Sequence, residues 1–235
     1  MYKNKTLSVI IPAYNEEKAI SSVIKGFQNL GIADKIIIVD NNSEDMTAEI
    51  AKKLGAKVVK EKRQGYGHAC IRGLKESNTD LTVLVEGDST FDPKDTIRML
   101  KLSSQYDMVM GSRTTKSWYG EKANMNWYIR LGNYLLSTLL RILYRPGVPL
   151  NDVGCTYRVI RKKTLENFVT NLEIGGCDFT PEMTVEALKA DASIKQIPIY
   201  YNQRKGDTKL SDNWLHSLKI GVLHFILILR KRFCS

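Results

Sequence analysis

Two carboxylates stand one residue apart in the segment VLVEGDSTFDP (83–93), directly after an apolar run. Because residues i and i+2 of an extended chain point to the same side, we expect Glu86 and Asp88 to lie side by side, with Gly87 letting a ligand approach the backbone. Two adjacent anions repel each other unless a positive charge lies between them. Mg²⁺ and Mn²⁺ satisfy such a pair and also bind substrate phosphates. The spacing therefore predicts a metal or phosphate site.

A local structural role for Asp88 is the alternative, because an aspartate often caps a helix and a helical pattern follows. Asp92 is the better cap for that helix, since Pro93 then takes the first helical position and Asp95 lies in the first turn. With the cap assigned elsewhere, metal or phosphate binding is the favoured hypothesis for Glu86 and Asp88.

Apolar runs typical of buried strands alternate with helical patterns through the first half of the chain. The runs include TLSVIIPAY (6–14), KIIIVD (35–40), LTVLVEGD (81–88) and DMVMGSR (107–113). Val/Ile/Leu-rich runs separated by helices predict an α/β fold with a mostly parallel sheet flanked by helices. Ligands of such sheets bind beyond the carboxyl ends of the strands. The polar residues at those ends are Tyr14, Asn15, Glu16, Asp40, Asn41, Asn42, Glu86, Asp88, Ser112 and Arg113.

Composition narrows the class of partner. The chain has 235 residues, enough for one sizeable core, and a net charge of +10, which predicts an anionic partner. We do not expect nucleic acid, because no recognised module is present and the positive charge is dispersed. Four scattered cysteines without a CxxC pair suit free thiols in a reducing compartment. The N-terminal apolar run is too short for a signal peptide, so a location inside the cell is expected.

Five segments in order resemble family 2 glycosyltransferases of the GT-A fold, a Rossmann-like architecture. They are SVIIPAYNEE (8–17), IIIVDNNSEDMT (36–47), RQGYGHACIRG (63–73), VEGD (85–88) and GSR (111–113). The later stretches VGCTYRVI and RKGDTKLSD extend the resemblance toward the dolichyl- and polyprenyl-phosphate mannose (glycosyl) synthases. The resemblance implies a GDP- or UDP-sugar donor, Mg²⁺ or Mn²⁺, and a polyprenyl (dolichyl-type) phosphate acceptor. It also implies transfer with inversion and without a covalent intermediate.

The resemblance assigns a donor site and a metal site residue by residue. The metal would be held by Glu86 and Asp88, which stand in place of an Asp-x-Asp motif. Asn41 stands where an aspartate is usual, and Gln64 and Tyr66 depart from the usual glycine-rich loop. The donor-binding residues that the resemblance implies are Pro12, Ala13, Tyr14, Glu16, Asp40, Asn41, Arg63, Gly65, Glu86, Gly87 and Asp88.

The second half of the chain is expected to bind the acceptor. Asp152 is the candidate general base, with an Asx-turn after the segment RPGVP (145–149) as the structural alternative. RKGDTKLSD (204–212) is either a phosphate clamp that closes on substrate or a polar linker. The residues expected to act in catalysis are Asp152, Asp88 and Arg113. Those expected to contact the donor or acceptor phosphates are Arg113, Arg158, Arg204 and Lys209.

Two apolar segments with interspersed basic residues, 127–145 and 213–233, suggest contact with an anionic membrane surface. The alternative for 127–145 is a helix packed on the sheet, and the alternative for 213–233 is a dimer-forming or core helix. We expect a catalytic domain over 1–212, with a nucleotide-sugar-binding half (1–115) and an acceptor half (116–212). A basic, apolar or amphipathic helix at 213–235 would then hold the protein peripherally on the cytoplasmic face of a membrane.

Other functions remain open on the sequence. A family 2 enzyme acting on a glycan or another non-polyprenyl acceptor fits nearly as well, and a non-catalytic nucleotide-sugar-binding relative is a further possibility. A nucleotidyltransferase would carry a glycine-rich basic loop after the first strand, where this chain has the acidic PAYNEE. A dinucleotide-dependent enzyme would carry G-x-G-x-x-G there, and that motif is absent.

Overall fold

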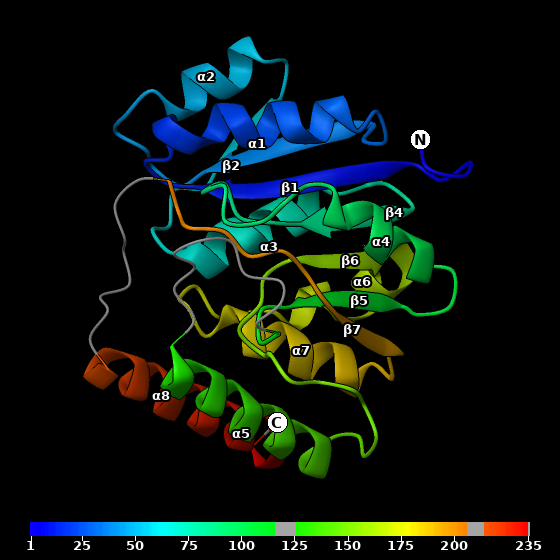
Figure 1. Cartoon of the computed structure of the whole chain (residues 1–235), viewed down its shortest axis with the longest axis vertical. Coiled ribbons are helices and arrows are strands. Elements are labelled where there is room, and N and C mark those ends of the chain that lie inside the picture. Colours follow the sequence, from blue (N-terminus) through cyan, green and yellow to red (C-terminus); the bar gives the residue numbers. More distant parts are fainter. Residues whose placement is uncertain (116–125, 206–213, 235) are drawn as a thin grey trace.

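The computed structural model describes residues 1–115, 126–205 and 214–234. Within these residues the chain folds around one seven-stranded sheet with the strand order β3-β2-β1-β4-β6-β5-β7 (Figure 1). The strands are β1 (Leu7–Ala13), β2 (Lys35–Asp40), β3 (Lys57–Lys60), β4 (Leu81–Leu84), β5 (Met108–Ser112), β6 (Arg158–Arg161) and β7 (Ile194–Pro198). The helices are α1 (Glu17–Asn29), α2 (Thr47–Lys53), α3 (Tyr66–Glu76), α4 (Asp95–Leu102), α5 (Trp127–Leu143), α6 (Lys162–Phe168), α7 (Phe179–Lys189) and α8 (Trp214–Phe233), with a 3₁₀ turn η2 (Val169–Asn171).

The sheet is mostly parallel, as the sequence predicts. Only β6, among the described strands, runs against its neighbours: it pairs antiparallel with both β4 and β5. Two parallel pairs end level, since Ala13 pairs with Asp40 across β1 and β2, and Ser112 pairs with Pro198 across β5 and β7, whereas β4 ends at Leu84 opposite Ile10 of β1. Their carboxyl ends therefore share one edge of the sheet, where ligands of such folds bind.

Side-chain alternation along the strands builds a core on each face of the sheet. On β1, Val9 and Ile11 belong to the cluster shared with α1, α2 and α4, whereas Ile10 belongs to the cluster shared with α3, α6 and α7. All three side chains are fully buried. A strand covered on both faces is mostly apolar along its whole length, and this is why LSVIIPA, apart from the buried Ser8, shows no polar alternation.

Two element boundaries differ from the sequence prediction. The run at 81–88 is a strand only as far as Leu84, so Glu86 and Asp88 lie on an irregular segment beyond β4. The following helix begins at Asp95, and Asp92 does not cap it directly. Its Oδ1 instead accepts the Lys94 N–H at 2.9 Å and forms the turn that leads into α4.

Helices α5 and α8 pack side by side at the end of the molecule opposite α1 and α2 (Figure 1). α8 also packs on α7 and buries His224, Leu227 and Ile228 there. Both helices leave large apolar side chains in solvent, including Trp127, Leu131, Tyr134, Leu135 and Ile142 on α5 and Trp214, Leu215, Leu218, Phe225 and Ile226 on α8. Among the described helices, none has the length and apolarity needed to cross a membrane.

Candidate active site

The loops after β1 and β2 are held together by a set of hydrogen bonds at the carboxyl edge. Asn15 adopts a left-handed backbone conformation with φ 53°. Its side-chain oxygen accepts the Glu44 N–H at 2.9 Å, and its own N–H donates to the Ser43 hydroxyl at 3.1 Å. The Glu16 N–H donates to the Thr47 hydroxyl at 2.8 Å. These bonds fix the first-strand loop in one conformation, with Glu16 buried beside it.

The acid pair Glu86 and Asp88 lies beyond β4, as expected. Glu86 is half-buried and accepts the Thr156 hydroxyl at 2.7 Å, while Asp88 is buried and accepts both the N–H and the hydroxyl of Thr90. Burial and then the charge of Asp88 raise the pKa of Glu86 to about 7, against the opposing effect of the Thr156 bond. Asp88 thus forms a local turn with Thr90, and its charge also raises the pKa of Glu86.

The acid pair fits a hard divalent cation. Both residues offer carboxylate oxygens, the ligands that Mg²⁺ and Mn²⁺ prefer. Burial and the charge of Asp88 outweigh Arg113 and Arg204 in raising the pKa of Glu86, and an added cation would oppose that shift. A Cβ on Gly87 would lie 3.2 Å from Ile11 Cγ2 and 3.3 Å from Ile20 Cδ1, so a side chain there would press on β1 and α1, while the expected part of Gly87 in donor binding stays a prediction.

Arg204 joins the first-strand loop to the acid pair. Its Nη1 lies 3.2 Å from Asp88 Oδ2, and its Nη2 contacts Glu16 Oε1. The segment after β7 is positioned by backbone hydrogen bonds to the segment after β4, from Asn202 N to Thr90 O at 2.8 Å and from Lys205 N to Asp88 O at 3.1 Å. The side chain of Arg204, from the second half of the chain, therefore contacts two acidic residues of the first half. We call residues 14–16, 40–43, 86–90 and 201–205 together the cup.

Asn41 organises the loop that follows β3. Its amide nitrogen donates to the carbonyls of Glu61 and Arg63, and its oxygen accepts the Gly65 N–H at 2.8 Å. An aspartate could not donate the first two bonds, so asparagine at this position has a structural reason. Gly65 has φ 144°, and a Cβ there would lie 2.4 Å from the Gly175 carbonyl oxygen. The Arg63 side chain is largely exposed and pairs with Glu61.

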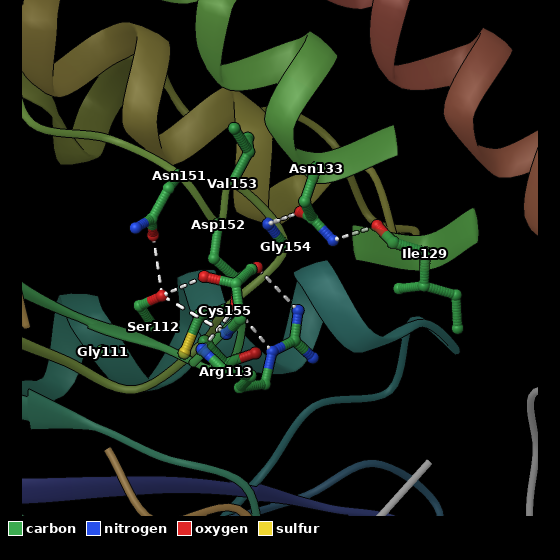
Figure 2. Close-up of polar contacts among 12 residues, drawn as sticks. Gly111, Ser112, Arg113, Ile129, Asn133, Asn151, Asp152, Val153, Gly154 and Cys155 are labelled. Carbon is green, nitrogen blue, oxygen red and sulfur yellow. Dashed lines mark hydrogen bonds and ion pairs between the residues drawn. The ribbon is translucent and has the colours of Figure 1, made fainter. Parts of the chain in front are cut away.

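Arg113 and Asp152 form a buried, bidentate ion pair at the end of β5 (Figure 2). Arg113 donates from Nε to Oδ2 and from Nη2 to Oδ1, both at 2.9 Å, and its backbone N–H donates to Oδ2 at 2.8 Å. Burial disfavours the charged guanidinium, but the charge and hydrogen bonds of Asp152 outweigh it and hold the pKa of Arg113 well above its ordinary value. The guanidinium also lies 5.5 Å from the centre of the Tyr201 ring.

The loop that carries Asp152 is anchored from two sides. Gln196 on β7 accepts the N–H groups of Asn151 and Asp152 and donates to the Asp152 carbonyl at 2.7 Å. Asn133 on α5 accepts the Gly154 N–H at 3.1 Å (Figure 2). Asp152 is fully buried, so its carboxylate orients Arg113 and is not open to an acceptor in this geometry. Its expected part as a direct general base is therefore corrected to a positioning part.

Arg158 lies outside the cup, contrary to expectation. It is fully buried on β6 and donates to the backbone carbonyls of Cys155 and Thr180, at 3.2 and 2.8 Å. Desolvation lowers its pKa to about 10. A guanidinium enclosed in this way holds core segments together and cannot contact a substrate phosphate. Lys209, also expected at the phosphates, lies outside the described residues.

The remaining expected donor residues lie where the sequence predicts. Pro12 and Ala13 end β1, and Asp40 ends β2 with its Oδ1 accepting the Ser43 N–H at 3.1 Å. Sequence reasoning missed Thr156 and Gln196, which support Glu86 and Asp152. Thr156 lies within the quoted stretch VGCTYRVI, but nothing local marks its contact or that of Gln196, because each acts on a residue distant in sequence. Thr90, two residues after Asp88, follows the ordinary spacing of an aspartate turn and could have been found.

Comparison with known proteins agrees with this geometry. The chain is 31% identical over 221 residues to a low-salt glycan biosynthesis hexosyltransferase of Haloferax volcanii, a match that covers 90% of this chain but about half, 52%, of that protein's length. It is 29% identical over 210 residues to a dolichyl-phosphate hexose transferase of the same organism, covering 89% of this chain and 88% of that protein.

The fold matches that of glucosyl-3-phosphoglycerate synthase from Mycobacterium tuberculosis, crystallised with Mn²⁺, uridine diphosphate and glucosyl-3-phosphoglycerate. The TM-score is 0.73 at 21% sequence identity, over 97% of this chain and 80% of that one. The family profile described as glycosyl transferase family 2 matches residues 8–169. The GT-A-like sheet and the acid pair agree with this match. The chain therefore belongs to glycosyl transferase family 2.

Proposed function

We propose that this glycosyltransferase moves a sugar from a nucleotide-sugar donor to a polyprenyl phosphate at a membrane surface. The observation that carries the proposal is the position of α5. Asn133 on this helix holds the loop of the Arg113–Asp152 pair, while Leu135 and Ile142 on the same helix are 58% and 70% exposed. A lipid bound along α5 would bring its phosphate to the edge of the cup.

The donor half of the proposal draws on the cup itself. Loops after β1, β2 and β4 converge there, and Arg204 adds a positive charge beside the acid pair. A nucleoside diphosphate needs both a surface for its base and ribose and cations for its phosphates. A divalent cation held by Glu86 and Asp88 would supply charge compensation for the diphosphate as it leaves. The neighbouring structure crystallised with Mn²⁺ and uridine diphosphate supports this assignment.

The geometry suits an acceptor that is already ionised. An alcohol acceptor needs a general base, whereas a phosphate is ionised near neutral pH and needs mainly orientation. Asp152, the expected base, is buried and paired with Arg113, which leaves it as a support for a phosphate-binding guanidinium. In the reaction, a phosphate oxygen forms a bond to the anomeric carbon. The bond from that carbon to the donor diphosphate breaks, and the electron pair leaves with the nucleoside diphosphate.

The exposed apolar side chains of α5 and α8 support a peripheral position on a membrane, which the proposed acceptor requires. The exposed apolar side chains of α5 and α8 form a surface that lipid would cover, with Arg230 and Arg232 near the end of α8. Lys231, expected to meet lipid phosphates with them, instead contacts the buried Glu182 and Glu186. The free cysteines Cys70, Cys155, Cys177 and Cys234 favour the cytoplasmic face, where thiols stay reduced.

The test is transfer of a labelled sugar from a panel of nucleotide sugars to polyprenyl phosphate, with the corresponding polyprenol as the matched acceptor that lacks the phosphate. We expect label in the lipid phase with polyprenyl phosphate only, loss of transfer on metal chelation, and loss in Asp88→Asn. Label on the polyprenol to an equal degree would refute the ionised-acceptor argument. Transfer to a soluble glycan with none to lipid would keep the enzyme class and replace the acceptor.

A further inference from the structure

Three potential metal ligands meet away from the cup, where α7 and α8 pack together. Cys177 and Asp178 directly precede α7, and His224 lies on α8, far away in the sequence. One ligand atom from each residue lies within 4.8 Å of the other two. Among the described residues, these three are the group of His, Cys, Asp or Glu side chains whose ligand atoms lie close enough together to hold one metal ion. The three residues belong neither to the segments that resemble the family nor to the expected donor-binding site.

We propose that Cys177, Asp178 and His224 form a binding site for Zn²⁺ that ties α8 to the start of α7. The two separations that involve Asp178 agree with tetrahedral coordination. His224 Nε2 lies 3.2 Å from Asp178 Oδ1, and Cys177 Sγ lies 3.6 Å from the same oxygen. Ordinary zinc bond lengths and a tetrahedral angle place nitrogen and oxygen ligands about 3.4 Å apart and sulfur and oxygen ligands about 3.6 Å apart.

His224 supplies the independent sign of a ligand. The residue is 8% exposed, and its Nε2 is buried without a hydrogen bond of adequate geometry in the described residues. A buried polar atom of this kind costs free energy unless it is satisfied. Asp178 Oδ1 lies 3.2 Å from this nitrogen, and a cation bound by both atoms would satisfy them together.

The ligand types select the metal. A thiolate, an imidazole and one carboxylate are a mixed, partly soft set, which suits Zn²⁺ and is unlike the all-oxygen acid pair of the cup. Cys177 lies at the surface, so a water molecule would complete the tetrahedron. The site differs from the cup in both location and chemistry. A chain that fails to transfer sugar would therefore leave this proposal untouched.

Thiol protection in the intact protein tests the site. Cys177 and Cys234 are both exposed, whereas Cys70 and Cys155 are buried, so Cys234 is a matched control within the same molecule. The protein is alkylated with iodoacetamide with and without Zn²⁺, and each cysteine is quantified by mass spectrometry. At free Zn²⁺ of about ten times Kd, about nine-tenths of the sites are filled, so Cys177 should react about tenfold more slowly. Cys234 should react at an unchanged rate.

Variants separate this site from other ways of binding zinc. Asp178→Asn and His224→Gln should each abolish the protection of Cys177, while Asp88→Asn in the cup should retain it. Co²⁺ should give a thiolate-to-metal charge-transfer absorption that Cys177→Ser removes and Cys234→Ser leaves. Equal protection of both thiols, no protection of either, or full protection in His224→Gln would each overturn the proposal. Because Asp178→Asn replaces a partly exposed side chain, it keeps the test valid even if His224→Gln unfolds.

Discussion

Replacing Lys231 on α8 with methionine should destabilise the whole fold, although the residue belongs to a terminal basic run. Its Nζ lies 2.9 Å from Glu182 Oε1 and 3.0 Å from Glu186 Oε1 on α7. The two glutamates are 0% and 2% exposed, and the lysine side chain is 13% exposed. Methionine has a similar shape without the charge, so two buried carboxylates would lose their counter-charge.

The size of the effect follows from this burial. Removing one partner of a buried ion pair costs about 3–5 kcal/mol, and we take about 3 because Lys231 retains some exposure and Glu182 keeps the N–H groups of Glu173 and Ile174. For a chain of this length, about 3 kcal/mol lowers Tm by roughly 6–12 °C. The matched change Arg230→Met, at the exposed neighbouring position, should alter the free energy of unfolding by less than about 0.5 kcal/mol.

Thermal and urea unfolding of both variants provide the measurement, and adding Glu186→Gln to Lys231→Met should recover part of the loss. The pKa of Lys231 is raised: burial lowers it, but the hydrogen bonds and charges of Glu182 and Glu186 more than compensate. A raised folded-state pKa means that the stabilisation is complete below the ordinary lysine range and disappears as pH rises through the folded-state value. A Lys231→Met protein as stable as Arg230→Met would refute the reasoning.

Three further predictions concern the site and the membrane. Thr156→Val removes the hydroxyl that supports the acid pair, so it should weaken activation by Mg²⁺ about 10-fold or more in a metal titration while Tm changes little. Asp152→Asn leaves a buried guanidinium without its counter-charge and should cost about 3 kcal/mol in urea unfolding and lower kcat; a kcat equal to that of the unaltered chain would contradict the positioning role. The double change Leu135→Ser and Ile142→Ser should weaken binding to anionic vesicles about tenfold or more in a sedimentation assay, because each side chain loses about 1 kcal/mol of burial in lipid. The exposed Met46→Ser on the opposite side of the molecule should not alter it.

The sequence predicts the fold of residues 1–115 well because local rules govern that half of the chain. The apolar run KIIIVD is β2, residue for residue. Strand-end positions predict where the polar residues gather, since the carboxyl ends of parallel strands lie at a common edge. Asp40, Glu86 and Asp88 lie there for that reason, and Arg204 contacts Asp88, while its expected part in a phosphate clamp stays a prediction.

The second half of the chain is predicted less well, because its contacts depend on strand order. Asp152 is a residue type that can serve as a general base, but the pairing of β5 with β6 brings it next to Arg113. Arg158 is a residue type that can bind phosphate, but its strand lies inside the sheet between β4 and β5, where its guanidinium donates to backbone carbonyls. Lys231 belongs to a run typical of lipid contact, yet the docking of α8 on α7 turns it inward. The spacing of these residues along the sequence does not reveal any of these contacts.

The reversed direction of β6 has a consequence for how such a protein can diversify. Because β6 starts at the edge where β4 and β5 end, the connection over residues 113–157 leaves from the rim of the cup and returns to the same rim. It need not cross the sheet, so its length is free of the limit that a parallel crossover imposes. Helix α5 lies within this connection. On the proposed function, insertions and replacements there would change the acceptor while the parallel strands of the first half keep their register, so new specificity could arise within one scaffold.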